Sequence, residues 1–387
     1  MPDHEPSEVV PERAVPFAVP DINDDDIDAV TQVLRSGWIT SGNQCVALEE
    51  ELAAYLGVPH VVSMSSATAA LETAVAFLNL PRGAKIGIPT WTFVSTALSA
   101  VHHGLQPVLL DVEPDTLNVS PASLACALDD GLAAMTGVHF GGVPFGMEIH
   151  EMCGSAGIPL IEDCAHSMGA SDHRGMAAGQ GTAGACFSFY ATKNLTSGEG
   201  GALATDDDDL ARFARSFRLH GLSADAWARY RPGAASGYDL LAPGIKGNLS
   251  DVLAALARSQ LRRFDDLQAR RRLLVGRYRE NLGHADLRVV PGDQVEGSAN
   301  HLVVVILPER APRQRVVGQL GARGVASSVH FQPLHTFGWF ASNSLVGPGG
   351  TPVADALAAR ALSLPLHTSL TLADVDYVCA VLIDAIG

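Results

Sequence analysis

Positive charge and cysteine are scarce in this sequence, and long hydrophobic runs are missing from it. Its 26 lysine and arginine residues are outnumbered by 42 aspartate and glutamate residues, which gives a net charge of −16. Nonspecific binding to nucleic acid or to an anionic membrane surface depends on clustered positive charge. Neither kind of partner is therefore expected, although a few local basic residues would suffice to bind a small anion.

No run of 18 apolar residues occurs along the 387-residue sequence, so no transmembrane helix is predicted. The first residues, MPDHEPSEVVPERAVPF, are acidic and rich in proline, and they lack the apolar centre of a signal peptide. We therefore expect a cytoplasmic protein.

The six cysteines are spread over the chain and none forms a CxxC pair. Neither a zinc ribbon nor a disulfide framework is therefore predicted, and no metal site is expected. Reduced and mostly buried thiols are the simpler interpretation for Cys45, Cys126, Cys153, Cys164, Cys186 and Cys379.

Hydrophobic residues make up 47% of the sequence and charged residues only 18%, which argues against disorder and provides a sizeable core. Apolar strands alternate with helical segments: HVVSM precedes SATAALETAVAFLNL, and KIGIP precedes TFVSTALSAVHHG. QPVLLDV, LAAMTGVHF and IPLIEDC are further predicted strands. Such alternation predicts an α/β domain whose mostly parallel sheet is covered on both faces.

Three regions are predicted along the chain. Residues 1–20 form a loose N-terminal arm, residues 21–255 the large α/β domain, and residues 256–387 a smaller C-terminal α+β domain. DINDDDIDAVTQVLRSG and NQCVALEEELAAYLG are predicted helices near the start of the large domain. A long, charged, amphipathic stretch over residues 250–283 is expected to lead out of that domain.

The segment GQGTAG places Gly179, Gly181 and Gly184 at the GxGxxG spacing of a dinucleotide-binding loop. That loop needs a strand before it and a helix after it. Here HRGMAA precedes the glycines and the strand-like ACFSFY follows them, so a dehydrogenase is disfavoured.

The segment SSATAALETA follows an apolar strand and is predicted to open a helix. Backbone N–H groups at such a helix N-terminus attract an anion, and Thr68 adds a hydroxyl donor. An ordinary serine or threonine N-cap produces the same pattern, so this segment alone leaves both interpretations open.

The segment IPLIEDCAHSMG places Glu162 and Asp163 at the C-terminal end of a predicted buried strand. Open α/β sheets place their ligand sites at such ends. A buried carboxylate needs a cation or strong hydrogen bonds, and His166 is close enough in sequence to orient Asp163. A structural carboxylate that caps the loop is the alternative.

The segment SFYATKNLTSGEGG contains a lysine, Lys193, after a short apolar run. A desolvated lysine has a lowered pKa and attacks carbonyl groups as the free amine, whereas most loop lysines are simply solvated. Ser188 would face the same cleft, and Gly198, Gly200 and Gly201 permit a close approach to a ligand. An amine, an anion site, a buried acid and a hydroxyl together are what pyridoxal 5′-phosphate requires.

Several long segments resemble the sugar-nucleotide aminotransferases of the DegT/DnrJ type, which have the aspartate-aminotransferase-like fold type I of pyridoxal-phosphate enzymes. The similarity runs from about residue 15 to the C-terminus. The SSATA and PGxKxN forms are most similar to the enzyme that forms UDP-4-amino-4-deoxy-L-arabinose and to antibiotic deoxysugar 4-aminotransferases. The matching segments, in order, are SGWITSG, SSATAAL, PTWTFVSTALSAV, VLLDVEPDTLNV, IEDCAHSMGA, FSFYATKN, GEGGAL, HGLSADAW and LAPGIKGNLSDVLAAL.

This resemblance implies a role for each matching residue around the cofactor. Lys193 would form the Schiff base with pyridoxal phosphate, and Asp163 would hold the pyridinium nitrogen. Ser188, Thr68 and the backbone at Ala67 would bind the phosphate.

The resemblance also assigns residues farther from the reacting carbon. Phe93 would stack on the cofactor ring, with Trp91 as a competitor for that role, and His166 would lie beside the cofactor hydroxyl. Asn248 would reach the phosphate in the other subunit, which implies a homodimer with shared active sites. Further expected substrate residues are Trp91, Lys246, His330 and His335. Arg229 and Arg231 are candidates for binding the diphosphate.

Two positions depart from the pattern of the family. Ala67 stands where many relatives have glycine, and Gly247 stands where an aromatic residue is usual. Gly141 and Gly142 leave the end of a predicted strand bare. We therefore expect a substrate pocket that is wider than, or shaped differently from, that of the nearest relatives.

The implied activity is a ping-pong transamination with L-glutamate as amino donor and pyridoxamine phosphate as the intermediate form of the cofactor. The acceptor would be a nucleotide-linked keto-deoxysugar, most simply a 4-ketone on UDP or dTDP, used for glycoside, antibiotic or surface polysaccharide biosynthesis. Another pyridoxal-phosphate reaction on a keto-sugar or keto-cyclitol is one alternative, and a non-catalytic regulator is another. Deoxygenating relatives carry histidine where this chain has Lys193, which favours transamination.

Overall fold

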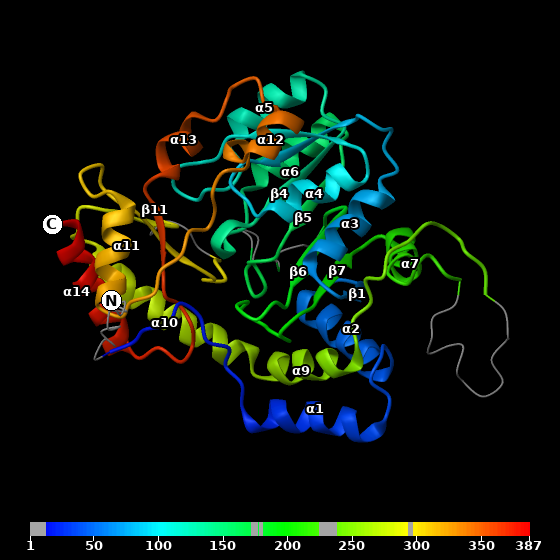
Figure 1. Ribbon diagram of the computed structural model, residues 1–387. Helices are drawn as coiled ribbons and strands as arrows, with labels where there is room; N and C mark the ends of the chain where they lie inside the picture. The colour runs from blue at the N-terminus through cyan, green and yellow to red at the C-terminus, as the bar shows by residue number, and fades with distance from the viewer. Residues whose placement is uncertain (1–12, 172–176, 178–180, 224–237, 293–296) are drawn as a thin grey trace, which may run out of the picture.

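The computed structural model describes residues 13–171, 177, 181–223, 238–292 and 297–387. Within these residues, an eight-stranded sheet has the order β1-β7-β6-β5-β4-β2-β3-β10, and a three-stranded sheet has the order β11-β9-β8. Figure 1 shows the large sheet between layers of helices, with α11 and α14 grouped at one side of it.

Strand β7 is antiparallel to both of its neighbours, β1 and β6, and the other pairs of the large sheet are parallel. The prediction of an α/β fold with a mostly parallel sheet is confirmed. Gly184 begins β6, so a strand follows the GQGTAG segment. The strands of this sheet are β1 (His60–Met64), β2 (Lys85–Pro89), β3 (Gln106–Leu110), β4 (Ala134–Val138), β5 (Leu160–Asp163), β6 (Gly184–Ser188), β7 (Gly201–Thr205) and β10 (Leu345–Val346).

Helices cover both faces of the large sheet. Successive side chains of a strand point to opposite faces, so each strand supplies apolar side chains to both cores. In β6, Ala185 and Phe187 pack in a core with α2, α9 and α10, whereas Cys186 packs in the core beneath α3 and α4. The helices of this region are α1 (Asp24–Ser36), α2 (Asn43–Leu56), α3 (Ala67–Phe77), α4 (Val94–His102), α5 (Pro121–Asp129), α6 (Met147–Ala156), α7 (Asp208–Phe217) and α9 (Asp251–Arg262), with a 3-10 turn at Phe140–Gly142.

The three-stranded antiparallel sheet has its own core. Tyr278, Val305 and Val378 pack together there, on α10, β9 and α14. The elements that follow α9 in the chain, besides β10, are α10 (Phe264–Leu282), β8 (Arg288–Val290), β9 (Val303–Ile306), α11 (Arg313–Ala322), a 3-10 turn (Leu334–Thr336), α12 (Gly338–Asn343), α13 (Pro352–Ala358), β11 (Ala361–Leu364) and α14 (Leu372–Ile386).

The long amphipathic stretch over residues 250–283 is two helices. Arg263 lies between them with φ −114° and ψ 14°, outside the helical range, so α9 ends there and α10 begins. Helix α9 packs on α1 and α2, whereas α10 packs on α14. The two sheets are therefore linked across this break. No helix among the described residues is long and apolar enough to cross a membrane.

The prediction of a loose N-terminal arm is wrong for the part that the structure describes. Val15 is only 2% exposed and pairs with the backbone of residues 324–326. Arg13 forms an ion pair with Asp374, and His367 hydrogen-bonds the carbonyl of Pro16. Apolar burial and backbone pairing thus attach residues 13–17 to the C-terminal part of the chain.

Residues 334–346 belong by sequence to the predicted C-terminal domain, but they pack on the large sheet. Leu334 and Phe340 lie in the core beneath α3 and α4, and β10 pairs in parallel with β3. The chain therefore returns to the large sheet after β9 and leaves it again to form β11.

Helix α1 presents apolar residues to solvent. Ile27 and Leu34 are 55% and 56% exposed, whereas Asp26 is fully buried. The Asp26 carboxylate accepts hydrogen bonds of 2.7 Å from both Arg263 and Gln260, which compensate its burial. The helix thus buries a polar contact and leaves much of its apolar surface uncovered.

All six cysteines are free, and five of them are buried. Only Cys126 is exposed, so the expectation of unpaired and mostly buried thiols is confirmed.

Candidate active site

A cavity of about 490 Å³ opens at the C-terminal ends of the parallel strands β4, β5 and β6. Val138, Asp163 and Ser188 reach it from the three strand ends, and Thr68 reaches it from the first turn of α3. Lys193 lines the same cavity from the loop after β6. The fold therefore brings together the amine, the acid and the hydroxyl groups that the sequence places far apart.

Lys193 is held in position by the turn that follows β6. Its backbone N–H donates to the carbonyl of Tyr190, and the flanking Phe189 and Leu195 are fully buried. Burial lowers the pKa of the Lys193 amine to about 8, and the nearby Asp163 carboxylate opposes this shift. A lowered pKa increases the fraction of free amine near neutral pH, which a nucleophilic lysine needs.

Asp163 receives two hydrogen bonds at the floor of the cavity. Thr96 Oγ1 donates to one carboxylate oxygen at 2.8 Å, and the N–H of Ala165 donates to the other at 3.1 Å. Thr92 contacts Thr96 Oγ1 at 2.8 Å, and because that hydroxyl already donates to Asp163, Thr92 is the donor. Burial raises the pKa of the Asp163 carboxyl, while Thr96 and Lys193 favour its charged form.

The hypothesis that His166 orients Asp163 is wrong, because the side chain that hydrogen-bonds the Asp163 carboxylate is Thr96. Among the described residues, no hydrogen bond joins His166 to Asp163; His166 Nδ1 instead accepts the N–H of Gly141 at 3.3 Å. Its ring stacks on Phe331 at 5.8 Å and lies 4.3 Å from the ring of His301. His166 thus forms part of the cavity wall beside the acid.

An anion-binding corner lies where α3 begins. Ser66 caps the helix by accepting the N–H of Ala69 at 3.1 Å, and the first N–H groups of a helix have no acceptor within it. Ala67, Thr68 and Ser188 line the cavity at this corner. A Cβ at Gly201 would lie 2.6 Å from the backbone nitrogen of Ala67, so only glycine lets β7 approach the helix start.

Thr96 and His301 are functional candidates that the sequence did not indicate. His301 lines the cavity, and its Nδ1 lies 2.9 Å from Oδ1 of Asn194, the residue after Lys193. Burial lowers the pKa values of both His301 and His166 well below the usual range, so both rings are neutral. Thr96 lies within the segment PTWTFVSTALSAV and contacts Asp163 from α4, whereas only the fold brings His301 to the cavity.

The two aromatic candidates lie in different places. Phe93 is 55% exposed and lines the cavity. Trp91 is fully buried in a hydrophobic core, and its indole N–H donates to the carbonyl of His330 at 3.1 Å. Trp91 therefore does not compete with Phe93 for a ligand in the cavity, and we withdraw its expected cofactor and substrate roles.

The candidate histidines of the VHFQPLH segment also separate. His330 lines the cavity, where burial lowers its pKa to about 4. His335 lies 2.7 Å from Thr90 Oγ1 and 2.8 Å from Asp355 Oδ1, away from the cavity lining. Its expected substrate role is not supported by its position in this chain.

Asn248 and Lys246 do not line the cavity of their own chain among the described residues. Lys246 donates to Asn248 Oδ1 at 2.6 Å, and Asn248 Nδ2 lies 2.6 Å from Ser41 Oγ. Lys246 is exposed and Asn248 is half-buried. Arg229 and Arg231 lie outside the described residues.

A larger cavity of about 750 Å³ lies between α1, α2 and α9. Asp25, Asp28, Gln32, Arg258 and Arg262 line it, and Lys193 and Asp163 do not. Because the reactive amine and the buried acid are elsewhere, we assign the chemistry to the smaller cavity.

The residues around the smaller cavity fit pyridoxal phosphate in their donor chemistry. Lys193 would supply the amine for the aldehyde, and Asp163 would supply a carboxylate for the protonated pyridine nitrogen. Ala67, Thr68 and Ser188 supply backbone and hydroxyl donors for the phosphate.

Comparisons with known proteins agree with this fit. The model of the DegT/DnrJ/EryC1/StrS aminotransferase family matches residues 20–383. The chain is 36% identical over 368 residues to the spore coat polysaccharide biosynthesis protein SpsC of Bacillus subtilis strain 168, covering 94% of each chain.

The solved structures that resemble this chain include aminotransferases as well. The putative sugar aminotransferase Spr1654 from Streptococcus pneumoniae in its PMP form superposes with a TM-score of 0.89 at 28% identity, covering 96% of this chain and 99% of that one. Its PLP form also has a TM-score of 0.89. The aminotransferase TlmJ from Streptoalloteichus hindustanus superposes with a TM-score of 0.88 at 30% identity, covering 96% and 99%. The chain therefore belongs to the DegT/DnrJ/EryC1/StrS family and is a pyridoxal-phosphate-dependent sugar aminotransferase.

Proposed function

We propose that this enzyme transfers an amino group from L-glutamate to the 4-keto carbon of a nucleotide-linked deoxysugar carried on UDP or dTDP. The observation that carries the proposal is the convergence of Lys193, Asp163, Ser188 and the start of α3 on one cavity of about 490 Å³. A cavity of this size takes the cofactor and a sugar ring, while a bulky nucleotide would extend through its open side.

In this proposal the bound cofactor supplies an electron sink for the carbanion next to the amine. The free amine of Lys193 moves a proton to and from the substrate carbon as general base and general acid. Asp163, fixed by Thr96 and Ala165, keeps a negative charge at the pyridine nitrogen. The neutral His166 and His301 rings line the cavity without adding a positive charge beside Lys193.

The sugar and its pathway are inferred from the relatives. SpsC is described as a spore coat polysaccharide biosynthesis protein, which supports a role in making an amino sugar for a surface polysaccharide. The resemblance of the SSATA and PGxKxN segments to 4-aminotransferases supports a ketone at carbon 4, for polysaccharide or antibiotic glycosides. Phe93, His330 and Phe331 lie at the cavity and would contact the sugar.

We also propose a homodimer in which Asn248 and Lys246 of one subunit complete the cavity of the other. Their loop lies outside its own cavity, which leaves it available to a partner. Ile27 and Leu34 of α1 and Val46 of α2 are 49–56% exposed, and an interface would cover these apolar side chains. Sedimentation analysis together with complementation between Lys193→Ala and Asn248→Ala subunits tests this arrangement, because only shared sites restore activity in the mixed dimer.

A half-reaction screen tests the proposed substrate. The enzyme is first converted to its pyridoxamine form with L-glutamate and then mixed with UDP- and dTDP-linked 4-keto and 3-keto sugars, while the absorbance of the pyridoxal form is followed. We expect one 4-keto sugar to restore this absorbance within seconds. Recovery with a 3-keto sugar or a keto-cyclitol alone would contradict the proposed substrate, and no spectral change with glutamate would favour a regulatory protein.

A further inference from the structure

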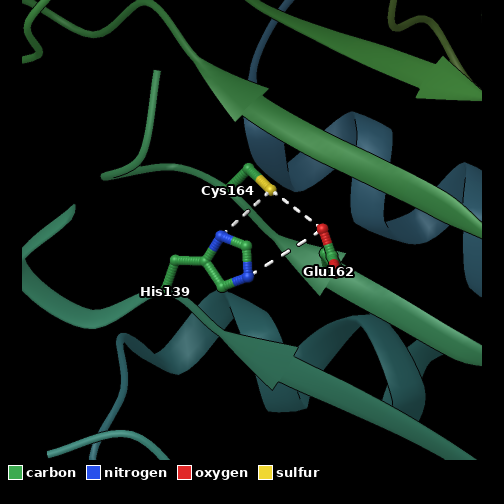
Figure 2. A group of neighbouring side chains, drawn as sticks. All are labelled: His139, Glu162 and Cys164. Carbon is green, nitrogen blue, oxygen red and sulfur yellow. Dashed lines mark hydrogen bonds and ion pairs between the residues drawn. The ribbon is translucent and has the colours of Figure 1, made fainter. Parts of the chain in front are cut away.

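A second group of polar side chains lies on the face of β5 opposite to the cavity. Glu162 comes immediately before Asp163 in β5, and Cys164 comes immediately after Asp163. His139 lies just beyond the end of the neighbouring strand β4. The His139 N–H donates to the carbonyl of Asp163 at 3.1 Å, which keeps the two strand ends together. His139, Glu162 and Cys164 are only 1–2% exposed, and Figure 2 shows that their side chains point toward one another.

One donor atom from each of the three side chains lies within 4.8 Å of the other two, which is close enough for one metal ion to contact all three after small side-chain movements. Cys164 Sγ lies 3.6 Å from His139 Nδ1 and 3.7 Å from Glu162 Oε2, and His139 Nε2 lies 3.8 Å from Glu162 Oε2. An N···O distance of 3.8 Å is too long for a hydrogen bond. Tetrahedral zinc ligands at their usual bond lengths lie about 3.3–3.7 Å apart.

The two ring nitrogens of His139 face different neighbours. Ser167 Oγ lies 3.0 Å and Cys164 Sγ 3.6 Å from Nδ1. Nε2 lies on the side of Glu162. A histidine whose Nδ1–H is held by a hydrogen bond and whose Nε2 faces an anionic ligand is the usual arrangement beside a zinc ion.

A fourth side chain lies at the edge of this group. His150 Nε2 is 3.3 Å from Glu162 Oε1, and its side chain is 21% exposed. His150 therefore lies between Glu162 and the surface, on a route by which an ion could enter.

We propose that His139, Glu162 and Cys164 bind a zinc ion behind the cofactor site. Thiolate, imidazole and carboxylate are the ligands that zinc takes in proteins, and one zinc ion balances the charge of one thiolate and one carboxylate. Only the tertiary structure joins these residues, because His139 and Cys164 belong to different strand ends.

The experiment uses the full-length enzyme loaded with its cofactor. Zinc content is measured by mass spectrometry after dialysis against a weak chelator, and affinity is measured by competition with a chromogenic zinc chelator. We expect about one zinc per chain, and an affinity at least about tenfold weaker in Cys164→Ser. Cys379→Ser, which changes a cysteine equally buried in the core of α14, is the matched control and should bind zinc as the parent does.

Equal zinc binding by the parent and Cys164→Ser, or no zinc binding by the parent, would overturn the proposal. In that case Glu162 is balanced by protonated histidines alone. If Cys164→Ser does not fold, anomalous scattering at the zinc edge from crystals of the parent replaces the variant. A peak between His139, Glu162 and Cys164 is then expected, and its absence in zinc-soaked crystals contradicts the site.

Discussion

The two consecutive carboxylates of β5, Asp163 and Glu162, lie in different surroundings although one peptide bond separates them. Asp163 faces the cavity, where a threonine hydroxyl, a backbone N–H and the amine of Lys193 favour its charge. Glu162 faces the opposite side, where His139 and His150 lie within 3.8 Å of its oxygens. Because side chains alternate along a strand, Asp163 faces the reaction cavity and Glu162 faces the buried polar group on the other side of the sheet.

This comparison separates two uses of a buried charge. A carboxylate that acts on a ligand needs few protein partners, so that the ligand itself can become the main partner. A carboxylate that supports the fold is more stable when the protein itself supplies its partners. Substitutions on the two faces of β5 should therefore affect different measurements.

The largest effect is expected from Lys193→Ala, which removes the side-chain amine that lines the cavity. Turnover should fall by at least about 10⁴-fold, because proton transfer and the covalent link to the cofactor are both lost. The variant should still bind pyridoxal phosphate noncovalently through the phosphate corner at α3. Steady-state assays and equilibrium dialysis check the two expectations, and substantial activity in this variant would contradict the assignment of Lys193.

Asp163→Asn and Glu162→Gln test the comparison directly. Asp163→Asn should lower kcat by about 10²–10³-fold, because the neutral amide no longer balances the protonated pyridine nitrogen. Its free energy of unfolding should change little in the apoprotein, because removal of a buried charge offsets the hydrogen bond lost from Ala165.

Glu162→Gln should instead lower the free energy of unfolding by about 1–3 kcal/mol, because the buried carboxylate accepts from the Cys164 thiol and lies 3.3 Å from His150 Nε2. Its loss of kcat should be much smaller than that of Asp163→Asn. Denaturant titration and steady-state kinetics of both variants provide the comparison. The interpretation fails if the two variants show the same ratio of lost stability to lost activity.

The pH dependence of cofactor attachment should reflect the lowered pKa of Lys193, which is about 8. Below this pH the protonated amine cannot attack, so the rate falls as pH decreases and levels off above it. At pH 7 about a tenth of the amine is free, so attachment should be about tenfold slower than at pH 9. Stopped-flow absorbance with the apoprotein measures this rate, with Nα-acetyl-lysine as the solvated reference. A rate that continues to rise toward pH 10.5, as for the reference, would show that the amine is not desolvated.

The smallest effect is expected from Thr96→Val, which removes one hydrogen bond to Asp163 and keeps the side-chain shape. The loss in kcat/KM should be about fivefold to tenfold, equivalent to about 1 kcal/mol. Thr73→Val is the matched control, because Thr73 is also buried but donates to the carbonyl of Ala69 in its own helix. Equal losses in the two variants would mean that Thr96 does not position Asp163.

Local pattern was enough to predict much of the fold. The strands at HVVSM and KIGIP and the helices that follow them are confirmed, because apolar runs and helical periodicity depend on neighbouring residues only. The arm was predicted wrongly because Val15 is buried by contacts with residues more than 300 positions away. The break at Arg263 was also missed, since the apolar pattern continues through it.

By itself, the sequence determined the reactive groups of this protein: a lysine after a strand, an acid at a strand end and a helix start rich in hydroxyl groups. These depend on residue type and on local periodicity, which the sequence states directly. The tertiary structure alone decided that Thr96 holds Asp163, that His301 reaches the cavity, that Trp91 is buried, and that His139 meets Cys164. The physical reason is that each of these contacts joins separate strands or helices, and the packing of the sheet sets their distance.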